Sequence, residues 1–216
     1  MRDIGLSIVV GLAAEARIAR ALGAVAIGGG QPDGAGAAAQ RLIASGADCL
    51  LSFGLAGGLD PGLRPGSVLI PHTIVYHQRA YPVDTSLIGT PTPHILIATD
   101  TAIKSAREKY ALYVETGAHA VDLESGEVAL AAAAANIPMA ALRVVCDPSD
   151  RDLGSAALVG ISATGRIAVF RVLAELSRDI GQIWGLFGLA KDARAAHASL
   201  REATRGVRCG RDRGRL

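Results

Sequence analysis

Short apolar runs alternate along the chain with alanine-rich or amphipathic stretches, and this alternation predicts strands and helices in turn. The predicted strands are residues 6–10, 25–27, 47–53, 67–76, 95–99, 118–123 and 139–146. The predicted helices are residues 13–22, 35–45, 100–113, 126–136 and 164–178. Strands that alternate with helices are typical of an α/β fold. We therefore expect a single α/β domain with a mixed, mostly parallel central sheet flanked by helices.

The most informative stretch, residues 118–152, contains a strand, a helix and a second strand. The helix is predicted to end before Pro138, because proline cannot continue its hydrogen-bond ladder. A strand–helix–strand unit of this length implies a parallel crossover. In open α/β sheets, ligands bind at the carboxyl ends of the strands. Glu124 and Asp147 follow these two strands, so we expect both carboxylates at one edge of the sheet.

Two motifs in this stretch carry a family resemblance. VDLESGEVA at 121–129 and LRVVCDPSD at 142–150 resemble the paired signature of the nucleoside phosphorylase/nucleosidase superfamily. The resemblance implies the three-layer fold of that superfamily and the release of a purine base from a nucleoside. It implies that Glu124 binds the ribose hydroxyls and that Asp147 handles a proton at N7 of the purine.

The chemistry of the two side chains fits these roles. A carboxylate can accept two hydrogen bonds from a cis-diol, and a positioned acid accelerates the departure of a poor leaving group by about 10²–10⁴. Each residue alone also has a simpler interpretation. Glu124 would be an acid favoured by the helix macrodipole, and Asp147 a turn residue before Pro148.

The sequence does not decide whether the attacking nucleophile is phosphate or water. Phosphate is our first expectation. Glu15, in the helix after Gly11, matches a glutamate that helps to activate water in nucleosidases of the superfamily. The alternative is that Glu15 is simply an acid at a helix N-terminus, where the helix macrodipole favours it. GLAGGL at 54–59 resembles the family's G-[ST]-A-G-G turn, but Leu55 replaces the usual hydroxyl residue. Ser52 stands about where hexameric phosphorylases carry a phosphate-binding arginine.

The resemblance also assigns the contacts with ligands. The residues that it places at the substrate are Glu124, Leu123, Ala56, Gly57 and Ile103, and those at phosphate or water are Gly11, Gly54 and Ser52. Residues near Ile103 lack the aromatic that stacks on the purine in relatives, so base recognition would rest on backbone and apolar contacts. His72 and His77 are minor candidates. The turn-rich segment 78–94 is expected to be a mobile loop. For GGGQPDG at 28–34 our first interpretation is a loop, and the second is a site whose backbone N–H groups bind phosphate.

Composition narrows the class of protein. The chain has 216 residues, half of them hydrophobic, and a net charge of only +2, which gives no reason to expect nucleic acid as a partner. Its three cysteines match no metal spacing and suggest a reducing compartment. No apolar run reaches the roughly 20 residues of a membrane span, and the N-terminus does not resemble a signal peptide. We expect a cytoplasmic protein without a metal or cofactor, and with inorganic phosphate as co-substrate.

The C-terminal third allows two interpretations. Residues 180–190 are apolar and contain the only Trp, and an arginine-rich stretch follows them. This pattern fits an interfacial helix on an anionic membrane, or a core or dimer-contact helix followed by a solvated tail. We expect a catalytic core at 1–165, helices completing the same domain at 166–204, and a basic flexible tail at 205–216.

Nearly the whole chain, including the ending GQ-x-x-x-L-x-x-LAKDARAA, is most similar to the hopanoid-associated branch of the superfamily. The resemblance implies a homodimer that releases adenine from adenosylhopane by phosphorolysis, with residues 180–216 in peripheral contact with the inner membrane. One alternative is a hydrolytic methylthioadenosine/adenosylhomocysteine nucleosidase. The other is a non-catalytic module that binds a nucleoside or lipid.

Overall fold

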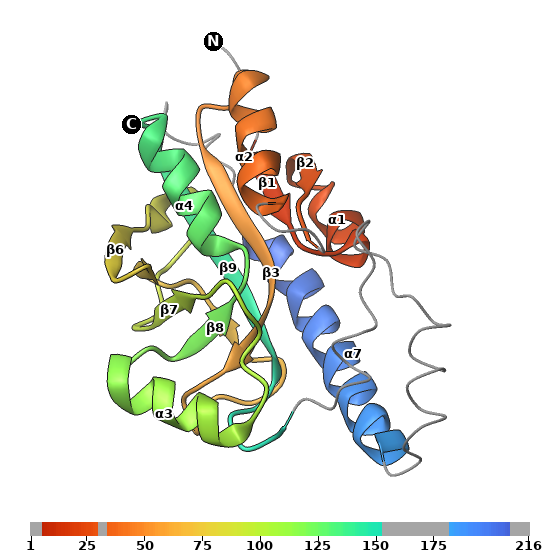
Figure 1. The fold of residues 1–216 in the computed structure, drawn as a ribbon. Coiled ribbons are helices and arrows are strands. Elements are labelled where there is room, and N and C mark those ends of the chain that lie inside the picture. The colour runs from red at the N-terminus through yellow and green to blue at the C-terminus, as the bar shows by residue number, and fades with distance from the viewer. Residues whose placement is uncertain (1–5, 30–33, 153–181, 208–216) are drawn as a thin grey trace.

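The computed structural model describes residues 6–29, 34–152 and 182–207 (Figure 1). Its strands are β1 (Leu6–Val10), β2 (Gly23–Ile27), β3 (Leu50–Gly58), β4 (Val68–Leu69), β5 (Thr73–Tyr76), β6 (Arg79–Pro82), β7 (Ile95–Ala98), β8 (Ala120–Asp122) and β9 (Met139–Asp147). Its helices are α1 (Ala13–Ala19), α2 (Gly34–Ala44), α3 (Ala106–Thr116), α4 (Ser125–Ala134) and α7 (Gln182–Gly206), with a 3₁₀ turn, η1 (Thr85–Leu87). The helix expected at 164–178 lies outside the described residues.

Within these ranges, nine strands form one sheet in which β3 is the central element. β3 runs parallel to β1 and to β9, and its last two residues pair antiparallel with β8. The pairs β1–β2, β5–β7 and β7–β8 are also parallel, whereas β4–β9 and β5–β6 are antiparallel. The predicted mixed, mostly parallel sheet is confirmed.

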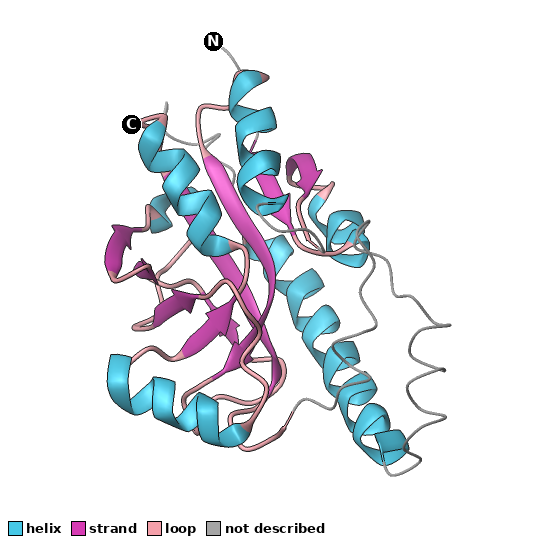
Figure 2. Ribbon diagram, viewed as in Figure 1, coloured by secondary structure: helices cyan, strands magenta, loops and turns pink. Residues whose placement is uncertain are grey.

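Helices cover both faces of the sheet, which gives the expected three layers (Figure 2). α2 and α4 lie side by side on one face, and α1 and α7 pack on the other. Alternation along the strands divides the side chains between the two layers. On β9, for example, Ala141 belongs to the cluster under α2 and α4, while Leu142 belongs to the cluster under α1 and α7.

The predicted parallel crossover over residues 118–147 is wrong. β8 is antiparallel to β3 through the pairs Gly57–Val121 and Gly58–Ala120, whereas β9 is parallel to β3. The two strands therefore run in opposite directions on either side of β3. The error arose because strand direction depends on pairing with β3, a segment distant in the sequence, and not on the helix between the two strands.

Other corrections concern segment ends. The glycine-rich residues 54–58 belong to β3 rather than to a turn. The long strand expected at 67–76 is two short strands, β4 and β5, separated by residues that include Pro71, which has no N–H to donate. The expected loop at 78–94 contains β6 and η1. Helix α3 starts later than predicted, because Ser105 and Glu108 form a capping box at its N-terminus.

The described part of α7 is a core helix. Ala196 and Leu200 are fully buried and share a cluster with Phe53 and Val144 of the sheet. This favours the core interpretation for residues 191–207. Among the described helices, none has an apolar stretch long enough to cross a membrane. The domain boundaries and the membrane contact of residues 180–216 stay predictions.

The packing of α4 on the sheet gives a test of the fold. A Cβ added to Gly126 would lie 2.4 Å from the Tyr76 ring and 2.8 Å from Ala98 Cβ. We expect Gly126→Ala to lower the free energy of unfolding by about 1–3 kcal/mol, because overpacking outweighs the gain in helix propensity. Urea unfolding measures the change. Gly206→Ala, where no atom lies within 4 Å of the added Cβ, is the control, and equal effects would contradict this packing.

Candidate active site

The candidate site lies at a gap in the sheet beside β3. β9 covers one edge of β3 along residues 50–57, so β1 and β8 share the opposite edge. β1 leaves that edge at Ser52, and β8 reaches it at Gly57 from the opposite direction. Because Glu15 follows β1 and Glu124 follows β8, the two strand ends bring these distant acids together beside the unpaired stretch of β3.

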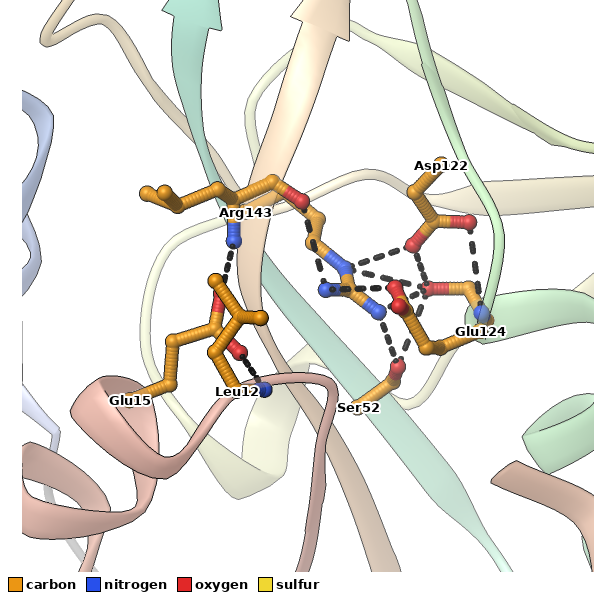
Figure 3. A network of polar contacts seen from close by, with 8 residues as sticks. Leu12, Glu15, Ser52, Asp122, Glu124 and Arg143 are labelled. Carbon is orange, nitrogen blue, oxygen red and sulfur yellow. Dashed lines mark hydrogen bonds and ion pairs between the residues drawn. The ribbon is translucent and has the colours of Figure 1, made fainter. Parts of the chain in front are cut away.

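A buried arginine of β9, Arg143, lies beside this gap (Figure 3). Its Nε lies 2.6 Å from Asp122 Oδ2, and neither side chain is more than 1% exposed. Its Nη2 donates to the hydroxyls of Ser52 at 2.6 Å and Ser125 at 3.0 Å. The Ser125 hydroxyl also donates to Asp122 at 2.5 Å. Nε and Nη2 of the guanidinium therefore both have partners, as a buried charge requires.

Glu15 is held by backbone donors at the start of α1. Its carboxylate accepts hydrogen bonds from the N–H groups of Leu12 at 2.7 Å and Leu55 at 2.9 Å. A Cβ at Gly54 would lie 2.6 Å from Glu15 Oε1 and 2.8 Å from Arg143 Nη1, so glycine is required there. Burial raises the pKa of Glu15, and the nearby guanidinium of Arg143 only partly offsets this.

Glu124 lies at the N-cap of α4, with Oε2 3.5 Å from Arg143 Nη1 and its side chain 19% exposed. A Cβ at Gly11 would lie 2.6 Å from Glu124 Oε1 and 3.5 Å from Glu15 Oε2, so both acids lie against the end of β1. Burial raises the pKa of Glu124 to about 7; Arg143 lowers it, while the charges of Asp122 and Glu15 add to the increase. This carboxyl can therefore change its protonation near neutral pH.

Asp147 ends β9 next to the same part of β3. The pairing of β3 with β9 skips Cys146, and this bulge brings Asp147 opposite Gly57. The Asp147 carboxylate is buried and lies 2.5 Å from Lys109 Nζ. Burial, and then the charges of Asp147 and Glu15, raise the pKa of the Cys146 thiol. Asp147 and Lys109 thus form a second charged pair, which lies farther along β3 than Glu15 and Glu124.

The other predicted site residues differ in how far they are exposed to solvent. Ser52 is fully buried, and its hydroxyl is hydrogen-bonded to Arg143 and Ser125. It would therefore act on a nucleophile indirectly, by holding the guanidinium of Arg143. Ala56 is buried and Leu123 is 47% exposed. Ile103 packs against a small cluster that contains Leu59 and Val121.

The two histidines are separate from the three acids. His77 pairs with Asp100 at an exposed position, and His72 bonds to the hydroxyl of the neighbouring Thr73. Neither is bonded to the acids at the gap. In the part of the chain that the structure describes, no group of three or more His, Cys, Asp or Glu side chains is arranged to hold a metal ion.

The sequence interpretation missed four residues of this site. Arg143 gave a signal, because it is the only charge in an otherwise apolar predicted strand. Asp122 and Ser125 lie inside the VDLES motif but were not assigned a role. Lys109 gave no signal, because a lysine on a surface helix is usually solvated.

The arrangement has an excess of negative charge around one guanidinium. Such a site stabilises positive charge that develops on a bound molecule, and its buried carboxylates can take up a proton from water. Two segments of the chain, residues 23–96 and 92–176, match the family model of the phosphorylase superfamily. The chain belongs to this superfamily. The assignment made from the two motifs is therefore confirmed at the level of the superfamily, while the hopanoid-associated branch stays a prediction.

Solved structures share the fold of this phosphorylase-superfamily protein at low sequence identity. The 5′-methylthioadenosine/S-adenosylhomocysteine nucleosidase of Neisseria meningitidis, in complex with methylthio-immucillin-A, has a TM-score of 0.66 and 15% identity, over 92% of this chain and 95% of its own. The futalosine hydrolase of Helicobacter pylori has a TM-score of 0.63 and 17% identity, over 93% and 97%. None of the curated proteins matches the chain.

The pKa of Glu124 predicts how the stability of this superfamily member depends on pH. With a folded pKa of about 7 against an ordinary 4.5, the folded protein holds a proton that the unfolded chain releases between these values. The free energy of unfolding should therefore fall as pH rises from about 4.5 to 7, by on the order of 1–3 kcal/mol for this group. Glu124→Gln should make this slope shallower in urea unfolding.

Glu15 contributes a slope of the same sign, so the dependence should not vanish in Glu124→Gln. Glu115→Gln, an exposed change on α3, is the matched control. A slope that is the same in wild type and Glu124→Gln would show that Glu124 is not buried as described.

Proposed function

We propose that this protein cleaves the N-glycosidic bond of a purine nucleoside and releases the base. The observation that supports this most is the convergence of Glu15, Glu124 and Arg143 at the gap beside β3, with Asp147 farther along the same strand. Membership of the phosphorylase superfamily agrees with such a reaction. A module that only binds would not need an acid at the position of Asp147.

In this proposal Glu124 accepts hydrogen bonds from the ribose hydroxyls. Arg143 Nη1, 3.5 Å from Glu124 Oε2, favours the carboxylate that this contact needs. As the bond to the base breaks, positive charge develops on the ribose, and the carboxylates of Glu124 and Glu15 stabilise it. Asp147 gives a proton to N7, which neutralises the charge on the departing base.

The charges at the gap favour water over phosphate as the nucleophile. Arg143 is already paired with Asp122 at 2.6 Å, and Glu15 and Glu124 lie next to its outer edge. A phosphate dianion beside two buried carboxylates would be repelled unless both were protonated. Water needs no such neutralisation, and Glu15 is positioned to take its proton. The first candidate is therefore a hydrolase of purine nucleosides.

The solved structures with this fold support a proposal for the substrate class. The proteins named above are a 5′-methylthioadenosine/S-adenosylhomocysteine nucleosidase and a futalosine hydrolase. We propose that this chain acts on a purine nucleoside with a substituent at the ribose 5′ position, methylthioadenosine and adenosylhomocysteine being the first to test.

The second candidate is phosphorolysis of adenosylhopane. It is supported by the resemblance of the sequence ending at residues 181–196 to the hopanoid-associated branch. In this candidate the protein is a cytoplasmic homodimer, and residues 180–216 contact the inner membrane. Apolar residues and arginines in that stretch would then bind the surface of the bilayer.

Product analysis separates the two candidates. The full-length protein is incubated with methylthioadenosine, adenosylhomocysteine or adenosylhopane, with and without inorganic phosphate, and products are identified by mass spectrometry. We expect the free sugar and adenine at a rate that does not depend on phosphate. A sugar phosphate formed only when phosphate is present would support the second candidate, and no base release from any purine nucleoside would contradict both.

Substitution of Asp147 tests the mechanism. We expect Asp147→Asn to lower kcat by about 10²–10⁴, because an amide cannot give the base a proton, with a smaller change in KM. The control is Asp150→Asn, an exposed aspartate in the same loop, which should leave kcat unchanged. Steady-state kinetics on the best substrate give the comparison. An unchanged kcat in Asp147→Asn would rule out this role for Asp147.

A further inference from the structure

Lys109 of α3 is a buried cation that the roles above leave without a function. Its side chain is 1% exposed. Its Nζ lies 2.5 Å from Asp147 Oδ2 and donates to the carbonyls of Pro148 at 2.9 Å and Arg151 at 3.0 Å. An ammonium group has three donors, so all of them are used. A lysine is rarely buried in this way unless it is paired.

These bonds give the two oxygens of Asp147 different surroundings. Oδ2 is taken by Lys109, whereas Oδ1 has only a weak contact with Cys146 Sγ at 3.3 Å. A Cβ at Gly57 would lie 3.3 Å from Oδ1 and 3.4 Å from Oδ2, so the whole carboxyl group lies against β3. Oδ1 is therefore the oxygen that remains for a proton shared with the base.

The loop that follows Asp147 is fastened to the same helix. Asp152 Oδ1 accepts a hydrogen bond from the N–H of Ala106 at 2.7 Å, in the first turn of α3. Lys109, one turn further along, holds Pro148 and Arg151. The position of Asp147 thus depends on α3, an element that carries none of the predicted site residues.

We propose that Lys109 is a positioning residue for the acid step, and this inference rests on the proposed function. Lys109 fixes Asp147 through Oδ2, and its ammonium stabilises the carboxylate that forms when the base takes the proton. In this step the C1′–N9 bond breaks and its electron pair moves into the purine. The Oδ1–H bond breaks and an N7–H bond forms. The Nζ of Lys109 faces a carboxyl that becomes negative as the base departs.

A purely structural role for Lys109 predicts different behaviour. A lysine that only ties the loop to α3 would affect every substrate and every pH equally when it is replaced. A cation that stabilises the developing carboxylate matters most when the leaving group depends strongly on proton transfer.

Lys109→Met and Lys109→Arg test the proposal, with Lys104→Met, an exposed lysine just before α3, as the matched control. The kcat of each variant is measured against pH for an adenine nucleoside and for its 2-fluoroadenine analogue, whose base departs more readily. We expect Lys109→Met to lower kcat by about 10²-fold with adenine and clearly less with 2-fluoroadenine. The pH profile of its kcat should also change, because a positive charge beside Asp147 has been removed.

Lys109→Arg retains the positive charge and should recover most of the kcat and the wild-type pH profile. If Lys109→Met does not fold, the uncharged double variant Lys109→Met/Asp147→Asn continues the test. Its kcat should equal that of Asp147→Asn alone, because Lys109 acts through Asp147.

The outcomes distinguish this inference from the proposed function. A wild-type protein that releases no base would contradict the proposed function itself. An active wild type whose Lys109→Met variant loses equal activity with both bases, at an unchanged pH profile, would overturn only the role of Lys109. Additive losses in the double variant would overturn it as well.

Discussion

The buried ion pair between Arg143 and Asp122 is the interaction on which the rest of the site depends. β9 and β8 flank β3 on opposite edges, so the pair joins two strands across a third. Removing one partner of a buried pair typically costs 3–5 kcal/mol, because the other charge is left without compensation. Ser52 and Ser125 also bond to the guanidinium. One side chain therefore fixes β3, β8, β9 and the start of α4, and with it the position of Glu124.

Two regions of charge result, and both contain side chains from β9. At the first, Arg143 faces Glu15 and Glu124, whose pKa values are raised by burial. At the second, Asp147 faces Lys109. The first has an excess of carboxylates, while the second is balanced. This difference matches chemistry in which one end of a substrate becomes positive and the other end becomes negative.

Much of the fold could be predicted from the sequence, because the apolar runs of β1, β7 and β9 have clear ends. The exceptions have physical causes. Glycines at 54–58 suggest a turn, yet they allow β3 to lie close to Glu15 and Arg143. The direction of β8 depends on pairing that is distant in the sequence. The start of α3 depended on which of several polar residues caps it, and Ser105 does so with Glu108.

Local sequence motifs could identify the three acids as candidate site residues, but not how they are arranged. Glu15 and Glu124 both lie against the end of β1, whereas Asp147 lies opposite Gly57 beside Lys109. The expectation that Glu124 and Asp147 share one edge of the sheet rested on a parallel crossover over residues 118–147, which the structure does not contain. The gap beside β3 could not be foreseen, because it requires β1 and β8 to end on the same edge. Lys109 could not be foreseen either, since nothing in the sequence of α3 indicates that this lysine points inward while its neighbour Tyr110 is exposed.

The position of α7 has a consequence for how the chain is made. Ala196 and Leu200, near the C-terminus, fill the core against the same sheet that carries the acids. During synthesis the part of this face that lies under α7 lacks that cover until residue 200 has left the ribosome, after all three acids have emerged. A chain released early would have its motifs but expose an apolar surface, and such surfaces favour aggregation and recruit chaperones.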